Sequence, residues 1–236
     1  MPQIDGLEPG TSSQRNALNH QAIEDYLKTI YTLAEQESPV STSRIATARQ
    51  VKPASVTGML QRLSKLNLVH YEKHYGVTLT EAGRKIALEV IRHHRLLELY
   101  LMEALGFSWD EVHEQADILE HVISEKLEER IAAALGHPTI DPHGDPIPTR
   151  DGAMPAVSGE PLTGMDVGAR VQVTRIPDDT NSKVLRDLAE LGLVPGTEIE
   201  ITAVAPHDGS LSLKIGDQTH TINQTLAQNI LVSPAG

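Results

Sequence analysis

Apolar residues in the first part of the chain recur at helical spacing and predict three helices. The first is expected over residues 19–36 and the second over residues 41–49. The third begins at Pro53, because proline suits the first turn of a helix. The apolar residues on the inner faces of the first and third helices are Ile23, Leu27, Ile30, Ala34, Val56, Leu60 and Leu63. Residues 1–18 have no such period and are interpreted as a flexible arm.

Two strand-like segments follow the third helix, Val69–Glu72 and Val77–Leu79, with a turn at His74–Gly76 between them. A helix, a short turn, a second helix and a two-stranded wing form, in this order, a winged helix-turn-helix. We therefore predict that residues 1–80 make up one domain of this type.

The middle of the chain predicts a second, helical domain over residues 81–136. Its helices are expected at Glu81–Leu105, residues 108–121 and Glu125–Leu135. Ser108 and Glu111 have the spacing of a capping box, which marks the start of the second of these helices.

The last part of the chain changes from helical to strand periodicity. Residues 137–164 contain many prolines and glycines without an apolar period and are interpreted as a linker. Beyond them come short segments between tight turns: strands Arg170–Arg175, Glu198–Val204, Ser210–Ile215 and Ile230–Val232, and a helix near Val184–Leu191. Such strands are typical of a small SH3-like barrel, which we place at residues 165–236. The predicted fold class is mainly α with small β parts.

Composition narrows the setting in which the protein works. The 236 residues include no cysteine, which excludes disulfides, thiolate nucleophiles and thiolate metal ligands. No apolar run approaches the roughly 20 residues that span a bilayer, and the N-terminus has no features of a signal peptide. These observations favour a cytoplasmic protein without a membrane partner.

Charge is distributed unevenly along the chain, whose formal net charge is −12. Residues 38–76 are basic and contain Glu72 as their one acidic residue, whereas residues 107–131 are strongly acidic. The basic segment suits a phosphate backbone and the acidic segment suits a cation. The negative net charge alone argues against binding to nucleic acid, which is also negatively charged. The basic segment at residues 38–76 removes this objection.

The third helix carries residue types suited to the major groove of double-stranded DNA. Its outward positions are Ser55, Thr57, Gly58 and Gln61. Short side chains let a helix sit deep in the groove, and Gln61 can pair with a base edge. The basic residues expected to reach phosphates are Arg44, Lys52, Arg62, Lys65 and Lys73. The alternative is a solvated helix face beside an ordinary hairpin, and the pattern favours DNA binding.

Carboxylate and imidazole side chains share helix faces in and before the acidic segment. The residues at helical spacing are His94 and Glu98 on one helix, and His113, Asp117, Glu120 and His121 on the next. Asp25 stands off the apolar face of the first helix. Such side chains on facing helices can converge on a divalent cation. The alternative is a solvated acidic helix.

Several segments together resemble the diphtheria-toxin-repressor family, including its manganese-transport-regulator branch. They are EDYLKTIY (24–31), residues 52–69, LTEAGR (79–84), residues 93–97, VHEQADILEHVI (112–123), HGDPIP (143–148) and LAELGLVPG (188–196). The resemblance covers nearly the whole chain from Ile23. It implies a metal-dependent repressor, with Mn²⁺ or Fe²⁺ as cofactor, that binds a palindromic DNA operator as a homodimer and usually silences metal-uptake genes.

The resemblance also implies roles for individual residues. Positions of the principal metal site correspond to Asp25, Asp117, Glu120 and His121, and positions of an ancillary site correspond to His94, Glu98 and His113. In the manganese branch the His94 position joins the main cluster instead. The iron branch has sulfur ligands at the positions of Asp25 and Asp117, so the carboxylates here favour manganese.

Two features depart from the family or align loosely with it. Lys28 stands where the manganese branch has a glutamate, so the two-metal cluster of that branch is not expected. In the iron branch the SH3-like domain lends ligands to the ancillary site. Asp178, Asp179 and Asn181 lie near that stretch but cannot be assigned to it.

Two other classes of function stay open. His113, Glu114 and Asp117 match the zinc-protease motif except that Asp117 replaces its second histidine, and Glu114 could act as a general base on a metal-bound water. No substrate-binding element accompanies this motif, so we predict neither catalytic residues nor a small-molecule substrate. The third hypothesis is a winged-helix regulator whose effector is an organic ligand.

Overall fold

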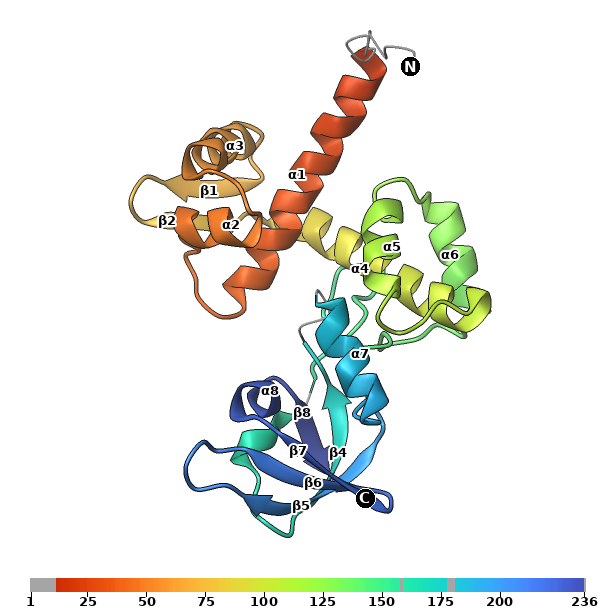
Figure 1. Cartoon of the computed structure of the whole chain (residues 1–236). Coiled ribbons are helices and arrows are strands. Elements are labelled where there is room, and N and C mark those ends of the chain that lie inside the picture. The colour runs from red at the N-terminus through yellow and green to blue at the C-terminus, as the bar shows by residue number, and fades with distance from the viewer. Residues whose placement is uncertain (1–11, 158, 178–180, 236) are drawn as a thin grey trace, which may run out of the picture. The chain divides into compact units, whose positions relative to one another are not determined.

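The computed structural model describes residues 12–157, 159–177 and 181–235, and Figure 1 shows its helices and strands. It divides into two compact units. The first unit is Met1–Val90 and the second is Ile91–Gly236, so that the boundary lies within the long helix α4 (Glu81–Leu105). Each unit has an apolar core of its own.

The first unit is a winged helix-turn-helix, as predicted. Its elements before α4 are α1 (Ser12–Ala34), α2 (Thr42–Ala48), α3 (Pro53–Lys65), β1 (Val69–Glu72) and β2 (Gly76–Leu79). The strands pair antiparallel, with Val69 opposite Leu79. Five of the seven residues predicted on the inner faces are fully buried, and the other two, Ile23 and Ala34, are partly buried. This core holds α3 against the hairpin and leaves the opposite face of α3 in solvent.

The helix boundaries of the first unit match the sequence analysis to within two residues except at the start of α1. Ser41 caps α2, because its Oγ accepts a hydrogen bond from Arg44 N at 3.2 Å. The helix α1 begins at Ser12 and not at Asn19, so the arm predicted over residues 1–18 is helical from Ser12 onward. The intervening sequence contains neither glycine nor proline and extends a helix that the core already stabilises. The rest of the predicted arm lies outside the described residues.

In the second unit, α5 (Val112–Leu119) and α6 (Glu125–Ala134) pack with the later part of α4 around Leu96, Val112 and Ile131. The helix α5 is shorter than the predicted 108–121. The Glu111 carboxylate accepts hydrogen bonds from the backbone and hydroxyl of Ser108, which therefore donates and does not cap the helix. As a result, Glu120 and His121 lie in a turn directly after α5.

Part of the segment predicted to be a linker is buried. Residues 141–148 are all buried in the second unit. Asp141 Oδ1 accepts hydrogen bonds from the backbone of His143 and Asp145, both at 2.8 Å. Gly144 has φ +88°, and a Cβ there would lie 2.0 Å from the carbonyl oxygen of Thr174. Glycine and proline thus allow close packing in this segment, and their density alone did not mark a free connection.

The C-terminal part is an antiparallel sheet of the SH3-like type, which confirms the predicted fold class. Its strands are β3 (Glu160–Pro161), β4 (Arg170–Arg175), β5 (Glu198–Val204), β6 (Leu211–Ile215), β7 (Gln218–Ile222) and β8 (Leu231–Pro234). Their order in the sheet is β3-β8-β4-β5-β6-β7. Two helices, α7 (Ser182–Glu190) and α8 (Gln224–Gln228), accompany it. The sequence analysis missed β7, which is mostly polar, and α8.

None of the described helices combines the length and the apolar character needed to cross a membrane.

Candidate functional site

The exposed face of α3 is the candidate DNA-reading surface. Val56, Leu60 and Leu63 are buried beneath it, whereas Ser55, Gly58 and Gln61 are exposed. A Cβ added at Gly58 would meet nothing within 4 Å. Thr57 is half-buried, and its Oγ1 donates to the carbonyl of Pro53 at 3.1 Å. A flat, uncharged strip of small side chains therefore runs along the helix, as groove insertion requires.

Basic side chains surround this strip. Lys52, Lys65 and Lys73 are exposed, the last of them on the wing. Arg62 donates to Asn19 Oδ1 at 3.0 Å, which aligns its guanidinium along α1. Arg44 pairs with Glu37 at 3.0 Å. Lys73 also lines a cleft of about 330 Å³ between the wing and α2, together with hydroxyl-bearing residues such as Ser41 and Thr57.

Asp25, a predicted metal ligand, lies in the first unit on α1. Its Oδ2 is 2.7 Å from an Arg49 guanidinium nitrogen, and both side chains are partly buried. The same guanidinium lies over the ring of Tyr26, 5.5 Å from its centre. The carboxylate of Asp25 is thus held in place by contacts within the helix-turn-helix.

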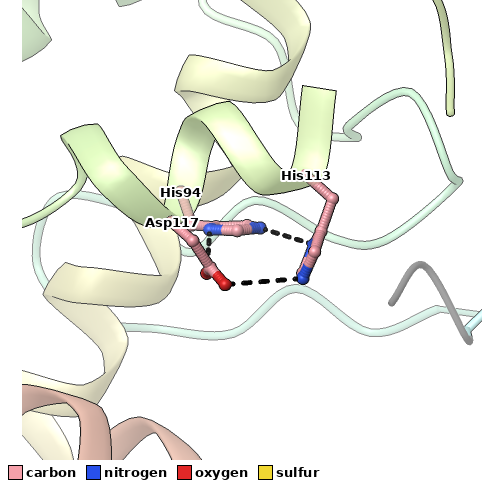
Figure 2. A group of neighbouring side chains, drawn as sticks. All are labelled: His94, His113 and Asp117. Atoms are coloured by element: carbon pink, nitrogen blue, oxygen red, sulfur yellow. Dashed lines mark hydrogen bonds and ion pairs between the residues drawn. The ribbon is translucent and has the colours of Figure 1, made fainter. Parts of the chain in front are cut away.

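The second unit brings the other predicted ligands together around His94, which is buried on α4. On one side, His94 Nδ1 lies 2.5 Å from Glu120 Oε2 and 3.3 Å from Asp117 Oδ1. On the other side, His94 Nε2 lies 2.9 Å from Glu98 Oε1 and 3.1 Å from His113 Nδ1. Figure 2 shows His113 and Asp117 reaching His94 from one helix.

The position of His94 makes it a shared element of two groups of ligands. A neutral imidazole offers one lone pair and one N–H, so it can bind a metal on one side only and must donate on the other. In either tautomer the donating nitrogen of His94 faces a carboxylate, Glu120 or Glu98. Such carboxylate partners orient a histidine and raise its basicity as a metal ligand.

Glu120 and His121 form the far edge of this cluster. Glu120 is almost fully buried, and its Oε1 lies 3.3 Å from His121 Nε2. Asp117, by contrast, has an exposed side chain on α5, with Oδ2 3.7 Å from His113 Nε2. The cluster therefore opens to solvent at Asp117, where a cation could enter.

A deeper group consists of Glu98, Asp141 and His143, all buried. One ligand atom of each lies within 4.8 Å of the other two. Among the described residues, Glu98 Oε2 and Asp141 Oδ2 accept no hydrogen bond. Their nearest cationic partners are His143 Nδ1 at 3.8 Å from Glu98 Oε2 and Arg95 Nε at 3.5 Å from Asp141 Oδ2. Burying a carboxylate oxygen without a donor is costly, and a divalent cation among these three residues would remove that cost. The donor set of two carboxylates and an imidazole fits such an ion.

The pKa values of Asp141 and Glu98 are shifted in opposite directions. Burial raises the pKa of Asp141 to about 8, and the charges of Glu98 and Asp145 act in the same direction. Burial also disfavours the charged form of Glu98, but the imidazoles of His94, His113 and His143 hold its pKa well below the usual value.

Sequence reasoning missed Asp141 and His143 because they lie in the segment interpreted as a linker. Their spacing of two residues, and the HGDPIP motif that begins at His143, were the available signals. Of the loosely aligned residues near α7, Asn181 caps that helix by accepting from Val184 N at 3.2 Å. Asp178 and Asp179 lie outside the described residues.

A winged helix-turn-helix on the same chain as a helical cluster of carboxylates and imidazoles defines the class of metal-dependent DNA-binding regulators. Residues 20–77 match the family described as "Iron dependent repressor, N-terminal DNA binding domain". Residues 80–149 match "Iron dependent repressor, metal binding and dimerisation domain", and residues 160–234 match the FeoA domain.

Individual proteins show the same relationship. The chain is 30% identical over 224 residues to the iron-dependent repressor IdeR of Mycobacterium tuberculosis (strain ATCC 25618 / H37Rv), which covers 89% of this chain and 95% of that protein. It is 28% identical over 213 residues to the diphtheria toxin repressor of Corynebacterium efficiens, covering 84% of this chain and 93% of that one. A solved manganese-dependent transcriptional repressor in complex with manganese superposes with a TM-score of 0.81, at 37% identity, over 90% of this chain and 100% of that one.

The chain belongs to the iron-dependent repressor family. It is a metal-dependent transcriptional regulator that binds DNA, takes Mn²⁺ or Fe²⁺ and forms a homodimer. It is not an enzyme, since its relatives are transcriptional repressors. Glu114, the base that the hydrolase hypothesis requires, lies on the exposed side of α5.

Proposed function

We propose that the chain is a manganese-activated repressor that binds a palindromic operator as a dimer and silences metal-uptake genes in the cytoplasm. The observation that carries this proposal is the donor set around His94, in which carboxylates and imidazoles converge and no sulfur takes part. Hard oxygen ligands suit manganese over softer metals. The solved relative with 37% identity is named as manganese-dependent, which supports the same choice.

The proposed principal ligands are Asp25, Asp117, Glu120 and His121. The proposed second group contains Glu98, His113, Asp141 and His143, and His94 lies between the two groups. A bound divalent cation supplies positive charge that holds its carboxylates together and neutralises their repulsion. The chain itself must hold these ligands in the arrangement that binds the cation.

Asp25 is the ligand that we propose couples metal to DNA binding, because it belongs to the DNA-binding unit. Metal needs only to bind the DNA-competent arrangement better than the free one. Asp25 pairs with Arg49 through Oδ2, so this guanidinium competes with a cation for the charge of the carboxylate.

The first prediction concerns the salt dependence of DNA binding. An acidic protein must bind DNA through its localised basic surface, and each neutralised phosphate adds about −0.9 to the slope of log affinity against log salt. Arg62→Ala and Lys65→Ala should each flatten this slope by about one such increment. Lys214→Ala removes the same charge from an exposed position on β6 and should leave the slope unchanged. Equal slopes in all four proteins would contradict the docking of α3 on DNA.

The second prediction concerns the dimer. Exposed apolar side chains gather on and after α5 and on α6: Ile118 is 62%, Val122 76% and Leu127 52% exposed. We propose that they form the dimer contact, since a second copy would remove them from water. Val122→Asp should convert the dimer to a monomer in light scattering with manganese present. Val204→Asp, at an exposed apolar position of β5, is the matched control and should remain dimeric.

The variant Val122→Asp also tests whether the operator is palindromic. Duplexes selected from a random pool by the manganese-loaded protein should be palindromic, with half-sites about 34–36 Å apart. Val122→Asp should fail to enrich such sequences. Enrichment of single half-sites by the parent protein, or a dimeric Val122→Asp, would refute this arrangement.

A further inference from the structure

Two of the proposed ligands lie in the turn that follows α5, where Glu120 N still donates to the carbonyl of Ala116 at 2.9 Å. Glu120 is the C-cap of α5, and His121 follows it in the turn. The last carbonyl groups of a helix have no donor within the helix and need one from elsewhere. How this turn is held decides where the carboxylate of Glu120 and the imidazole of His121 point.

The donor comes from His93 on α4. This imidazole is buried, and its Nδ1 lies 3.2 Å from the backbone oxygen of Glu120. A carbonyl oxygen can only accept, so Nδ1 must carry the proton. Although His93 adjoins His94 in the chain, consecutive residues of a helix project in different directions. His93 thus faces the backbone of the turn, while His94 faces its side chains.

The other ring nitrogen of His93 is buried and accepts or donates no hydrogen bond among the described residues. This Nε2 lies 3.4 Å from Glu128 Oε2 on α6, a contact that is an ion pair when the ring is doubly protonated. Glu128 is buried, and its Oε1 accepts from Arg92 Nε at 2.6 Å. Arg92 also donates to the carbonyl of Pro148 at 2.8 Å. A chain of polar contacts therefore runs from the buried segment 141–148 through Arg92, Glu128 and His93 to the turn.

We propose that His93 is a positioning residue of the metal centre, which acts through the backbone of Glu120 to hold both Glu120 and His121 toward the metal. This inference rests on the proposed function, in which those two residues are ligands. Both ring nitrogens of His93 face protein groups, so its role is to orient the turn and not to bind the metal. Partners that orient metal ligands typically contribute about 10–100-fold to metal affinity.

A pair of amide substitutions tests this role. His93→Asn places an amide donor near the position of Nδ1, and His93→Gln places one near the position of Nε2. Both keep a polar side chain of similar size in the same buried place. We expect His93→Asn to bind Mn²⁺ within a few-fold of the parent in isothermal titration. His93→Gln should bind about 10–100-fold more weakly at the principal site.

Further readouts separate positioning from a merely structural contact. The visible spectrum of the Co²⁺-loaded protein should change in His93→Gln and be retained in His93→Asn. Thermal unfolding without metal reports the structural contribution of each substitution. If the two variants lose equal stability and bind Mn²⁺ equally, or if His93→Gln binds better than His93→Asn, the proposal is overturned.

The variant Glu120→Ala separates a failure of the His93 proposal from a failure of the ligand assignment on which it rests. Glu120→Ala should lose Mn²⁺ at the principal site. If Glu120→Ala keeps its Mn²⁺ affinity, the ligand assignment fails, and the positioning role fails with it. If Glu120→Ala loses the metal while His93→Gln keeps it, the ligand assignment stands and the role of His93 alone is wrong.

Discussion

Replacing Glu120 or His121 with alanine is expected to abolish the response of DNA binding to manganese. Both residues lie at the edge of the cluster around His94, and Glu120 is almost fully buried there. Without either ligand, the cation loses its preference for the DNA-competent arrangement. The change should remove a coupling of about 5–150-fold in DNA affinity, the usual allosteric range. The fold and weak non-specific DNA binding should remain.

The matched control is Glu114→Ala. Glu114 lies on α5 and is exposed, like the predicted ligand Asp117, but Asp117 contacts His94 and His113 and Glu114 does not. This substitution removes the same carboxylate charge as Glu120→Ala and should leave the manganese response intact. Fluorescence anisotropy of a labelled operator, titrated with protein at fixed manganese, measures each variant. A parent-like response in Glu120→Ala and His121→Ala would place the metal site elsewhere.

The second large effect is expected for metal binding at the deeper group of Glu98, Asp141 and His143. We expect each chain to bind two Mn²⁺ ions, and Asp141→Asn to bind one. Asn keeps the oxygen that accepts from the backbone of His143 and Asp145, so the turn is preserved. It replaces the other carboxyl oxygen with an amide nitrogen, which cannot ligate a cation beside Glu98 and His143.

Metal-dependent stability measures this loss. A ligand present at 100 times its Kd stabilises a protein by about 2.7 kcal/mol, and Asp141→Asn should lose this increment at one site. Asp151→Asn, at an exposed carboxylate outside the cluster, should behave like the parent protein. Two ions per chain in Asp141→Asn, with unchanged metal-dependent stabilisation, would show that this group binds no metal.

The fold was largely predictable because its helices have local signals. The range Glu81–Leu105 and the strand Val69–Glu72 were predicted with the observed boundaries, since their apolar periods are long and their ends are marked. The start of α1 at Ser12 was not predicted, because residues 12–18 have no apolar period. The helix extends into these residues from later turns that pack in the core. The strand β7 was missed because it is mostly polar.

The candidate site was predictable where its members share a helix. The i, i+4 spacing of His94 and Glu98 pointed to one face of α4, and the structure brings both to the residues of α5. Asp141 and His143 gave no helical signal, because a loop carries them into the core. The pairing of Asp25 with Arg49, and the contact of His93 with the turn, join residues distant in sequence and could not be predicted.

The most direct test of a metal-activated repressor is the affinity of the unmodified protein for its selected operator, measured with Mn²⁺ and again after removal of the metal by a chelator. The predicted result is a 5–150-fold gain in affinity with Mn²⁺, the usual range of allosteric coupling, that is lost on chelation and restored when Mn²⁺ is added back. Equal affinity in the presence and absence of the metal would contradict the account.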